Sequence, residues 1–239
     1  LDEAKRSNDR EQLRSALLSS VSNDLKSPLS AMMGAAESLL LLENQLSRAD
    51  RLELVSTILQ ESQRLESYIQ NLLDMTRLEH GALSIERDWV PLDDLIGSAM
   101  GRLQRYHPEV ELDYHPDDSG QMLWVNGGLI EQAFFNILEN AAKYSPEGKA
   151  ITINVSVVDD HCRVEIEDRG PGIPERSREA IFDMFHVVAE GDKRQSGTGM
   201  GLAICRGMLA AHGGTVRAEA GAGGKGTRMV VELPTAQMP

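Results

Sequence analysis

Apolar positions in the first 80 residues repeat with the period of an α-helix. In the first run they recur every four residues, at Leu13, Leu17, Val21, Leu25 and Leu29. A second run, from Leu52 to Glu79, has the 3-4 spacing of a coiled-coil or bundle seam. The polar stretch between the runs predicts a turn, after which Ser47 and Asp50 cap the second helix.

These two runs predict a helical hairpin as the first domain, residues 1–80. Two antiparallel helices cannot bury both of their apolar faces by themselves. A second copy of the chain would cover the faces that remain. We therefore expect the hairpin to form a four-helix bundle in a homodimer.

Residues 81–239 form the second predicted domain, in which β-type runs and helical runs are mixed. Strands are predicted at 110–114, 151–157, 162–167, 215–220 and 228–233. Helices are predicted at 92–103, 129–144 and 201–212. This order predicts an α+β fold, an α/β sandwich in which helices cover one face of a mixed sheet.

The net charge of the chain limits the kinds of partner that it can bind. Acidic residues outnumber basic ones by 37 to 24, and the net charge of −13 argues against binding to nucleic acid or to an anionic membrane surface. A polyanionic ligand such as a nucleotide then needs a metal ion or a few local cations. Cys162 and Cys205 stand in apolar runs, which predicts buried free thiols in a reducing compartment.

The lengths of the apolar runs bear on the localisation of the chain. No run is long and apolar enough to span a bilayer, and the first residues already read as mid-helix. We expect a cytoplasmic fragment of a longer protein, with any membrane segment upstream of this chain.

The first candidate for chemistry is a polar stripe on the predicted helix 129–144. Its members are Asn136, Asn140, Lys143 and Tyr144. They fall on adjacent faces of one helix, so two amides, an ammonium and a phenol can meet one ligand. Amide oxygens suit Mg²⁺, which takes the rest of its shell from phosphates and water. A solvated polar stripe explains the segment equally well when it is taken alone.

The second candidate directly follows the predicted strand 162–167. It reads Asp168-Arg169-Gly170-Pro171-Gly172-Ile173. A carboxylate at a strand end can accept a hydrogen bond from an exocyclic amine such as that of adenine, and the glycines let backbone approach a flat base. Taken alone, an ordinary turn is the better interpretation.

The third candidate opens the predicted helix 201–212. It reads Gly197-Thr198-Gly199-Met200-Gly201-Leu202. Glycines before a helix N-terminus can cradle phosphate with backbone N–H groups. The segment is neither a P-loop nor a Rossmann fingerprint, because no Gly-Lys-Ser/Thr follows it and no buried strand precedes it.

The polar stretch 187–196 in front of this segment predicts a mobile lid. Lys193 and Arg194 on this stretch are candidate phosphate partners. A solvated charged loop accounts for either residue equally well.

The order and spacing of these segments resemble the Bergerat-type ATP-binding domain of histidine kinases, DNA gyrase, Hsp90-type chaperones and MutL-type repair proteins. The resemblance covers roughly residues 89–233. It implies that Asn140 holds Mg²⁺ and that Asp168 binds the adenine amine of ATP. It further implies that Tyr144 flanks the base and that Lys143 reaches the phosphates.

One position separates the branches of that family. The gyrase-like ATPases carry a glutamate four residues before the metal-binding asparagine, where it activates the hydrolytic water. This chain has Asn136 there, which is no base. The resemblance therefore favours a kinase that holds ATP without hydrolysing it.

The first helix contains Val21-Ser22-Asn23-Asp24-Leu25-Lys26-Ser27-Pro28-Leu29. This segment resembles the phosphoacceptor motif of two-component sensor histidine kinases, with Asn23 in place of the histidine. Asp24 matches the acid that orients the histidine and accepts its proton. Ser27 matches the residue that positions water for dephosphorylation of the partner. The surrounding residues look most like the Kdp-type kinases, which sense potassium limitation.

The resemblance as a whole implies a cytoplasmic kinase core from an inner-membrane-anchored bacterial sensor. Its γ-phosphate would pass to a hairpin histidine and then to an aspartate of a response-regulator receiver domain. Asn23 would block the first transfer, because its amide nitrogen is no nucleophile. The residue is either a deliberate change or natural, and the competence of the other matched positions favours the first. The alternatives are a nucleotide-binding pseudokinase and, less in keeping with the motifs, a stand-alone Bergerat-type ATPase.

Overall fold

A computed structural model describes residues 25–42, 45–79, 86–117, 119–158, 160–183, 186 and 199–235 of the chain. The chain forms two compact units, Leu1–Asp74 and Met75–Pro239. Each unit is described by itself below.

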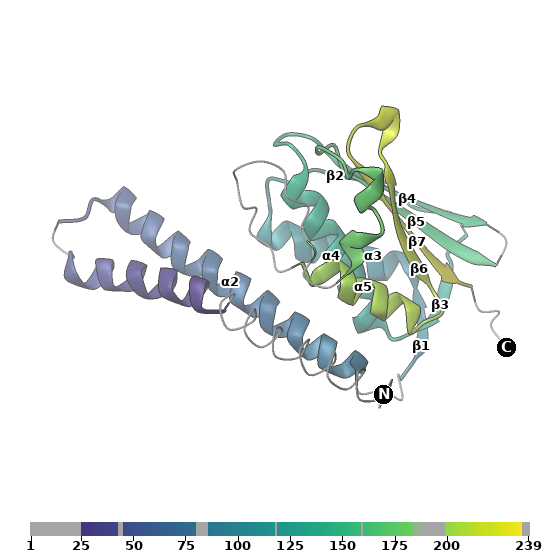
Figure 1. Ribbon diagram of the computed structural model, residues 1–239, viewed down its shortest axis with the longest axis horizontal. Coiled ribbons are helices and arrows are strands. Elements are labelled where there is room, and N and C mark those ends of the chain that lie inside the picture. The colour runs from purple at the N-terminus through teal and green to yellow at the C-terminus, as the bar shows by residue number, and fades with distance from the viewer. Residues whose placement is uncertain are drawn as a thin grey trace, which may run out of the picture. The chain divides into compact units, whose positions relative to one another are not determined.

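The first unit contains a helical hairpin. Residues 25–41 are helical, and α2 spans Arg48–Glu79 and runs back beside them (Figure 1). The predicted cap of α2 is confirmed, because the Ser47 N–H donates to Asp50 Oδ2 at 3.1 Å and the Asp50 N–H donates to Ser47 Oγ at 3.2 Å. This reciprocal pair satisfies two of the N–H groups that a helix start leaves unpaired.

The second unit is built on a five-stranded mixed sheet, as predicted. Its strands run in the order β2-β4-β5-β7-β6, with β2 parallel to β4 and the other neighbours antiparallel. Their bounds are β2 Leu112–His115, β4 Ile151–Val158, β5 His161–Glu167, β6 Thr215–Ala220 and β7 Thr227–Pro234. The inward side chains of β5 and β7 are almost completely buried, because both strands lie inside the sheet rather than at its edge.

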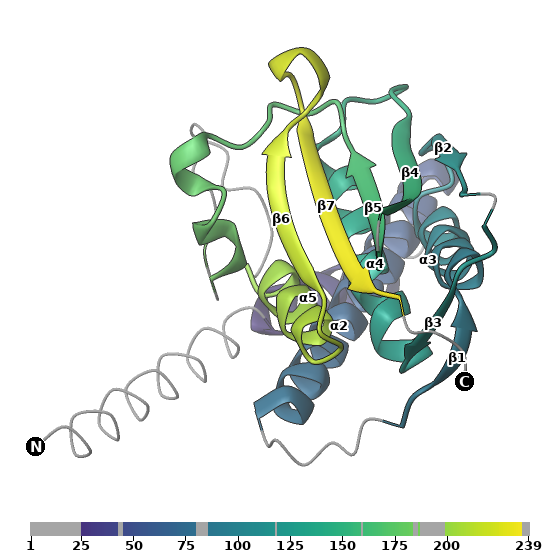
Figure 2. The ribbon, with the colours of Figure 1, turned by 90° about the vertical axis from the view of Figure 1, so that its right-hand side faces the viewer.

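Three helices cover one face of this sheet, which confirms the predicted fold class (Figure 2). They are α3 Leu92–Tyr106, α4 Gly127–Tyr144 and α5 Gly201–Ala210. The core between the helices and the sheet includes Phe134, Ile137 and Leu138 of α4, all nearly inaccessible to solvent. Short 3-10 turns, η1 Glu175–Ser177, η2 Ala180–Phe182 and η3 Ala222–Gly224, complete the described connections.

A small antiparallel sheet of β1 Asp88–Pro91 and β3 Met122–Val125 was not predicted. Each strand has only four residues, too few for a detectable alternation. Their pairing rests on contacts between distant residues, such as Trp89 and Trp124, whose ring centroids lie 5.5 Å apart. This sheet leads directly into α3 through Pro91.

Several predicted boundaries were wrong by a few residues. Helix α4 begins at Gly127 rather than at 129, because Asn126 Oδ1 caps it by accepting the Leu129 N–H at 3.0 Å. Strand β2 begins at Leu112, since the Val110 N–H is engaged in a turn with the His107 carbonyl. Helix α5 ends at Ala210, two residues earlier than predicted.

Both cysteines are buried free thiols, as predicted, and burial raises the pKa of Cys162 to about 11. Within the part of the chain that the structure describes, no helix combines the length and the apolar content that a bilayer crossing requires.

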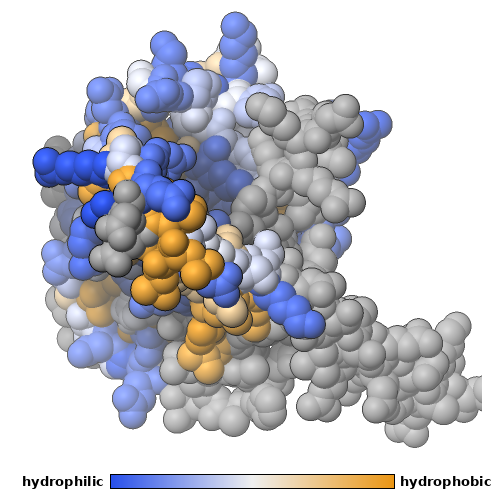
Figure 3. Space-filling model, turned by 90° about the vertical axis from the view of Figure 1, so that its left-hand side faces the viewer, coloured by the Kyte–Doolittle hydropathy of each residue, from blue (hydrophilic) through white to orange (hydrophobic). Residues whose placement is uncertain are grey.

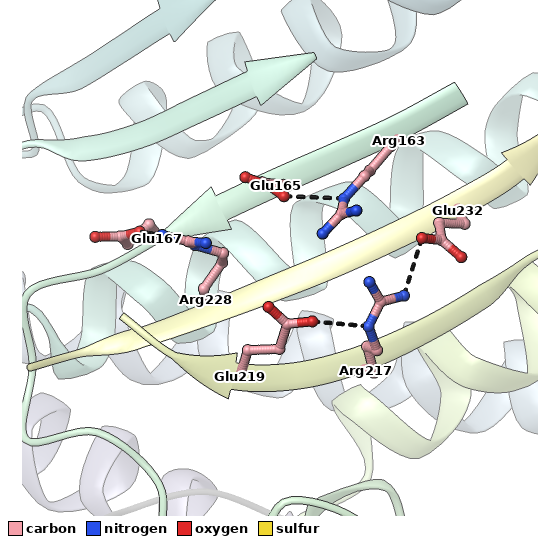
Figure 4. A network of polar contacts seen from close by, with 7 residues as sticks. All are labelled: Arg163, Glu165, Glu167, Arg217, Glu219, Arg228 and Glu232. Atoms are coloured by element: carbon pink, nitrogen blue, oxygen red, sulfur yellow. Dashed lines mark hydrogen bonds and ion pairs between the residues drawn. The ribbon is translucent and has the colours of Figure 1, made fainter. Parts of the chain in front are cut away.

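The sheet face opposite the helices carries alternating arginine and glutamate side chains (Figure 4). Arg217 on the edge strand β6 pairs with Glu219 at 2.8 Å and with Glu232 of β7 at 3.0 Å. Arg228 of β7 pairs with Glu167 of β5 at 2.9 Å. The two Arg217 pairs are partly exposed and add little stability each, but charges on an edge strand disfavour pairing with another sheet.

Candidate functional site

Helix α4 carries the first predicted segment and is the scaffold of the candidate site. Asn136 is buried at 2% exposure, Asn140 and Tyr144 are partly exposed, and Lys143 is exposed. The helix holds these side chains in place because its apolar face is locked into the core. The polar stripe is therefore not solvated along its whole length, since Asn136 lies inside the protein.

The two asparagines reach the glycine segment at the start of α5. Asn140 Nδ2 donates to the Asn136 carbonyl at 2.9 Å, and Asn136 Nδ2 lies 3.4 Å from the Gly201 carbonyl oxygen. A Cβ on Gly201 would stand 3.9 Å from Asn140 Nδ2. Two segments that are 65 residues apart thus meet, and backbone at the α5 start lies against the amides.

Glycine also shapes the approach to α5. Gly199 has a φ of 64°, and Met200 precedes the helix with no side-chain cap. Gly201 and Leu202 form the first turn of α5. The first N–H groups of such an uncapped turn are suited to bind an anion.

Asp168 stands at the end of β5 as predicted and is buried at 6% exposure. Its Oδ1 accepts the Gly170 N–H at 2.8 Å and the Thr227 N–H at 3.2 Å. Burial raises the pKa of Asp168, and these two N–H donors oppose the rise. Both of these N–H groups bind Oδ1 and not Oδ2, and the Thr227 side chain is a further hydrogen-bond partner that opposes the rise in pKa.

The turn after Asp168 packs tightly against α4 and against the segment before β7. A Cβ on Gly170 would lie 2.5 Å from the Tyr144 carbonyl oxygen. Gly172 has a φ of 81°, and a Cβ there would lie 2.9 Å from the Gly226 carbonyl oxygen. Only glycine fits at these two positions.

Helix α4 therefore touches both other segments, one toward each end of the stripe. Asn136 meets the start of α5, and Tyr144 meets the turn after Asp168. At 1.5 Å per residue, these two contacts lie about 12 Å apart along the helix axis. The site is elongated, with a carboxylate at one end and amides and an uncapped helix start at the other.

A shallow open depression of about 200 Å³ lies beside the carboxylate end. Its lining residues are Pro171, Gly172, Ile173, Pro174, Arg178, Ala220, Gly224 and Gly226. Gly172 and Ile173 of the predicted segment line it, whereas Asp168 and Asn140 do not.

Arg169 places a cation directly after Asp168 in the sequence, and the structure shows how its charge is balanced. Side chains alternate along a strand, so Arg169 and Glu167 lie on the opposite face from Asp168. Arg169 Nη1 pairs with Glu167 Oε1 at 3.1 Å. Burial works against ionisation of Glu167, but the Ala222 N–H and Arg228 hold its pKa below the ordinary value.

Some predicted residues lie outside the described part of the chain. These are Asn23, Asp24, Lys193, Arg194, Gly197 and Thr198. Ser27 is described, and it is exposed on the helix of residues 25–41.

The sequence analysis missed three residues that contact the site. Thr227 donates its N–H to Asp168, and Gln132 and Arg102 form hydrogen bonds that lead to Asn136. A glycine-rich run before Thr227 was a usable signal, because such runs let two backbone segments approach. The other two residues had no signal of their own.

His212 fixes the start of α4 to the end of α5. Its Nδ1–H donates to the Met208 carbonyl at 2.7 Å, and its Nε2 accepts the Asn126 N–H at 3.1 Å. An imidazole in this arrangement must be neutral, since the N–H of Asn126 faces Nε2. Burial lowers the pKa of His212 from 6.5, and nearby Arg87 lowers it further.

We predict that His212 makes folding sensitive to acid. The unfolded chain takes up a proton on this residue below about pH 6.5, whereas the folded chain resists it, so stability falls as the pH drops. The free energy of unfolding should fall by up to about 1.4 kcal/mol per pH unit more steeply than in His212→Gln. Urea unfolding between pH 8 and 5 measures this difference. His161→Gln, at an exposed histidine of β5, is the matched control and should keep the parent slope.

Comparisons with known proteins agree with this geometry. Residues 126–237 match the family model described as histidine kinase-, DNA gyrase B-, and HSP90-like ATPase. The fold and the site thus define a nucleotide-binding domain of this class. Residues 13–81 match the His Kinase A (phospho-acceptor) domain. With both domains in this order, the chain belongs to the two-component sensor histidine kinases.

Individual relatives support the same assignment. The chain is 34% identical over 221 residues to sensor protein KdpD of Escherichia coli, covering 91% of this chain and 24% of the relative. It is 36% identical over 219 residues to KdpD of Clostridium acetobutylicum, covering 90% and 24%. The chain therefore spans about a quarter of the length of these relatives. Histidine kinase ThkA, solved in complex with response regulator protein TrrA, has the same fold, with a TM-score of 0.69 and 20% identity over 98% of this chain and 66% of that one.

Proposed function

We propose that this chain is the kinase core of a sensor histidine kinase, which binds ATP with Mg²⁺ and transfers its γ-phosphate. The acceptor would be a hairpin histidine at position 23, and a response-regulator aspartate would receive the phosphate next. The observation that carries the proposal is the arrangement around α4, which joins a buried carboxylate and a glycine-shaped helix start in one elongated site.

The base of ATP binds at the carboxylate end in this proposal. Asp168 is held by Oδ1, so Oδ2 can accept a hydrogen bond from the adenine amine. Gly170 and Gly172 keep this end free of side chains, and Ile173 adds apolar surface. Tyr144 lies at the same end of α4, where its ring can flank the base. Adenine is favoured over a base with a carbonyl at that position, since a carboxylate cannot donate.

The phosphates bind at the other end, against the start of α5. Asn140 uses Nδ2 within the helix, which leaves its Oδ1 for Mg²⁺, a hard cation that prefers oxygen. Lys143 is one turn further along α4 and supplies positive charge. Gly197, Thr198, Gly199, Gly201 and Leu202 supply backbone around the phosphates, with Lys193 and Arg194 from the lid. When bound, Mg²⁺ neutralises charge on the phosphates.

Asn136 directs the site toward transfer rather than hydrolysis. Its side chain stands where a water-activating carboxylate would be needed, and its Oδ1 already accepts the Gln132 N–H at 2.9 Å. An amide so engaged cannot take a proton from water. The proposed nucleotide therefore survives until an acceptor is presented.

The hairpin supplies that acceptor position and, in this proposal, the dimer interface. Apolar side chains gather on its surface, as the orange region of Figure 3 shows. On α2 they recur with 3-4 spacing, at Leu52, Val55, Leu59, Ile69 and Leu73, each at least 48% exposed. Burial of such a seam in a second copy gives the four-helix bundle.

Further parts of the proposal rest on the relatives. The functional domains are 1–80 and 81–239, and the likeness to ThkA in complex with TrrA supports docking of a receiver domain on the hairpin. The KdpD relatives support a Kdp-type sensor of potassium limitation, anchored in the inner membrane by a region beyond this chain. Asp24 and Ser27 then serve proton transfer and dephosphorylation next to the acceptor.

Calorimetric titration tests the nucleotide site directly. The chain is expected to bind ATP in the presence of Mg²⁺, with a weaker interaction in EDTA and no steady release of phosphate. An absence of heat with ATP under both conditions would refute the proposal. A continuous turnover of ATP would instead favour the stand-alone ATPase.

A further inference from the structure

A chain of buried and partly buried hydrogen bonds runs from α3 through α4 to the start of α5. Arg102 Nη1 donates to Gln132 Oε1 at 2.6 Å, and Gln132 Nε2 donates to Asn136 Oδ1 at 2.9 Å. Asn136 Nδ2 then faces the Gly201 carbonyl oxygen at 3.4 Å. Gln132 is 7% exposed and Asn136 2%, so water does not compete freely for these groups.

The direction of this chain follows from the chemistry of its first member. A guanidinium has only donors, so the group of Gln132 that meets Arg102 must be its oxygen. The Gln132 amide nitrogen must then face Asn136, which in turn meets it with Oδ1. The Asn136 –NH₂ group is left to face Gly201. Arg102, which has only donors, thus fixes which end of the Gln132 amide and which end of the Asn136 amide faces each neighbour.

The orientation of Arg102 is itself well fixed. Its guanidinium carbon lies 3.9 Å from the centroid of the Phe135 ring, and Nη1 is 3.7 Å from Glu131 Oε2. A cation held over a ring face, with a carboxylate beside it, keeps its direction. Arg102 therefore sits as a fixed donor next to Gln132 rather than as a freely rotating surface side chain.

We propose that Arg102 and Gln132 are positioning residues that make Asn136 present its –NH₂ group, and not its oxygen, to the phosphate end of the site. This inference rests on the proposed nucleotide function. It assigns different roles to the two asparagines of α4. Asn140 supplies the oxygen for Mg²⁺, and Asn136 supplies donors that hold the α5 start and repel a misplaced cation.

Substitution of Gln132 by glutamate tests whether Gln132 fixes the orientation of the Asn136 amide. A carboxylate accepts only, so in Gln132→Glu the side chain keeps its pairing with Arg102 but can no longer donate to Asn136. Asn136 must turn its –NH₂ group to the carboxylate and its oxygen to the Gly201 carbonyl, which is also an acceptor. We expect affinity for ATP with Mg²⁺ to fall about three- to tenfold, the value of one hydrogen bond. The thermal midpoint should stay within a few degrees of that of the parent, because the ion pair with Arg102 offsets part of the cost of the buried charge and of the two facing oxygens.

Variants at position 102 test whether a donor-only side chain is needed there. Arg102→Met should weaken binding of ATP with Mg²⁺ by about three- to tenfold, since Gln132 becomes free to turn over. Arg102→Lys, which is also donor-only, should restore binding to within about twofold of the parent. The matched control is Arg105→Met, because Arg105 is an exposed arginine one turn further along α3.

A direct readout separates this inference from the nucleotide proposal. The side-chain amide resonances of Asn136, assigned by nuclear magnetic resonance in the chain without nucleotide, should shift in Gln132→Glu and not in Arg105→Met. Unchanged resonances in Gln132→Glu, or binding as tight as in the parent, would overturn the inference. So would an Arg102→Lys variant as weak as Arg102→Met. If the parent binds no ATP but the resonances shift as expected, the nucleotide proposal fails and the amide polarity stands.

Discussion

Replacement of Asn23 by histidine is expected to change a chain that gains no phosphate from ATP into one that labels itself. The amide nitrogen of asparagine has its lone pair delocalised into the carbonyl, so it cannot attack the γ-phosphate. An imidazole at the same position has a free ring nitrogen, and the next residue in the sequence, Asp24, is the proposed acceptor of its proton. Label from γ-³²P ATP should rise from background to a substantial fraction of the chains.

The chemistry of the product and two further variants make this result specific. A phosphohistidine is labile in acid and stable in base, unlike a phosphoserine, so the bound label should be lost on acidification. Asn23→Ala should remain unlabelled. The double variant Asn23→His with Asp168→Ala should lose the label as well, because it lacks the proposed base contact. An Asn23→His variant that binds ATP yet stays unlabelled would favour a pseudokinase over a kinase.

The helical hairpin and the main sheet could be predicted because their signals are local. The cap of α2 depends on two residues three apart, Ser47 and Asp50, and its geometry is as expected. The strands at 151–158 and 161–167 are long enough for their pattern to show. The paired four-residue strands at 88–91 and 122–125 are not, since their pairing depends on contact across more than 30 residues.

The residues of the candidate site also divide into those with a local sequence signal and those without one. Asn140 and Asp168 were predicted because each lies in a recognisable short segment. Gln132 was not, because its role depends on Arg102, which lies 30 residues earlier on another helix. Thr227 meets Asp168 across 59 residues, and only the glycines before it hinted at a close approach. Local patterns therefore identify the candidate ligand groups, whereas the residues that contact those groups become visible only in the fold.

Arg169 shows how a local pattern can mislead. Next to Asp168 in the sequence, a cation suggests a poor adenine pocket. In the sheet the two side chains lie on opposite faces, and Glu167 takes up the charge of Arg169 at 3.1 Å. Because side chains alternate between the faces of a strand, the positive charge of Arg169 does not lie beside the Asp168 carboxylate, although the two residues are adjacent in the sequence.

Asp168→Asn is expected to exchange the base preference of the site rather than simply abolish binding. The oxygen of asparagine can still accept the N–H groups of Gly170 and Thr227, which hold Oδ1 at 2.8 and 3.2 Å. The second oxygen becomes an –NH₂ group, which donates where the adenine amine also donates. Affinity for ATP should therefore fall about 10- to 100-fold, as expected for loss of a hydrogen bond to a charged group.

Inosine triphosphate, whose base carries a carbonyl oxygen in place of that amine, should bind the same variant more tightly than it binds the parent. Asp113→Asn, the same change at an exposed position of β2, is the control and should leave both affinities unaltered. Asp168→Ala should weaken both nucleotides, since it removes the contact without replacing it. Calorimetric titration of the two nucleotides against each variant gives the ratio of affinities directly. A ratio that stays at the parent value in Asp168→Asn, in a protein with an unchanged thermal midpoint, would show that this carboxylate does not read the base.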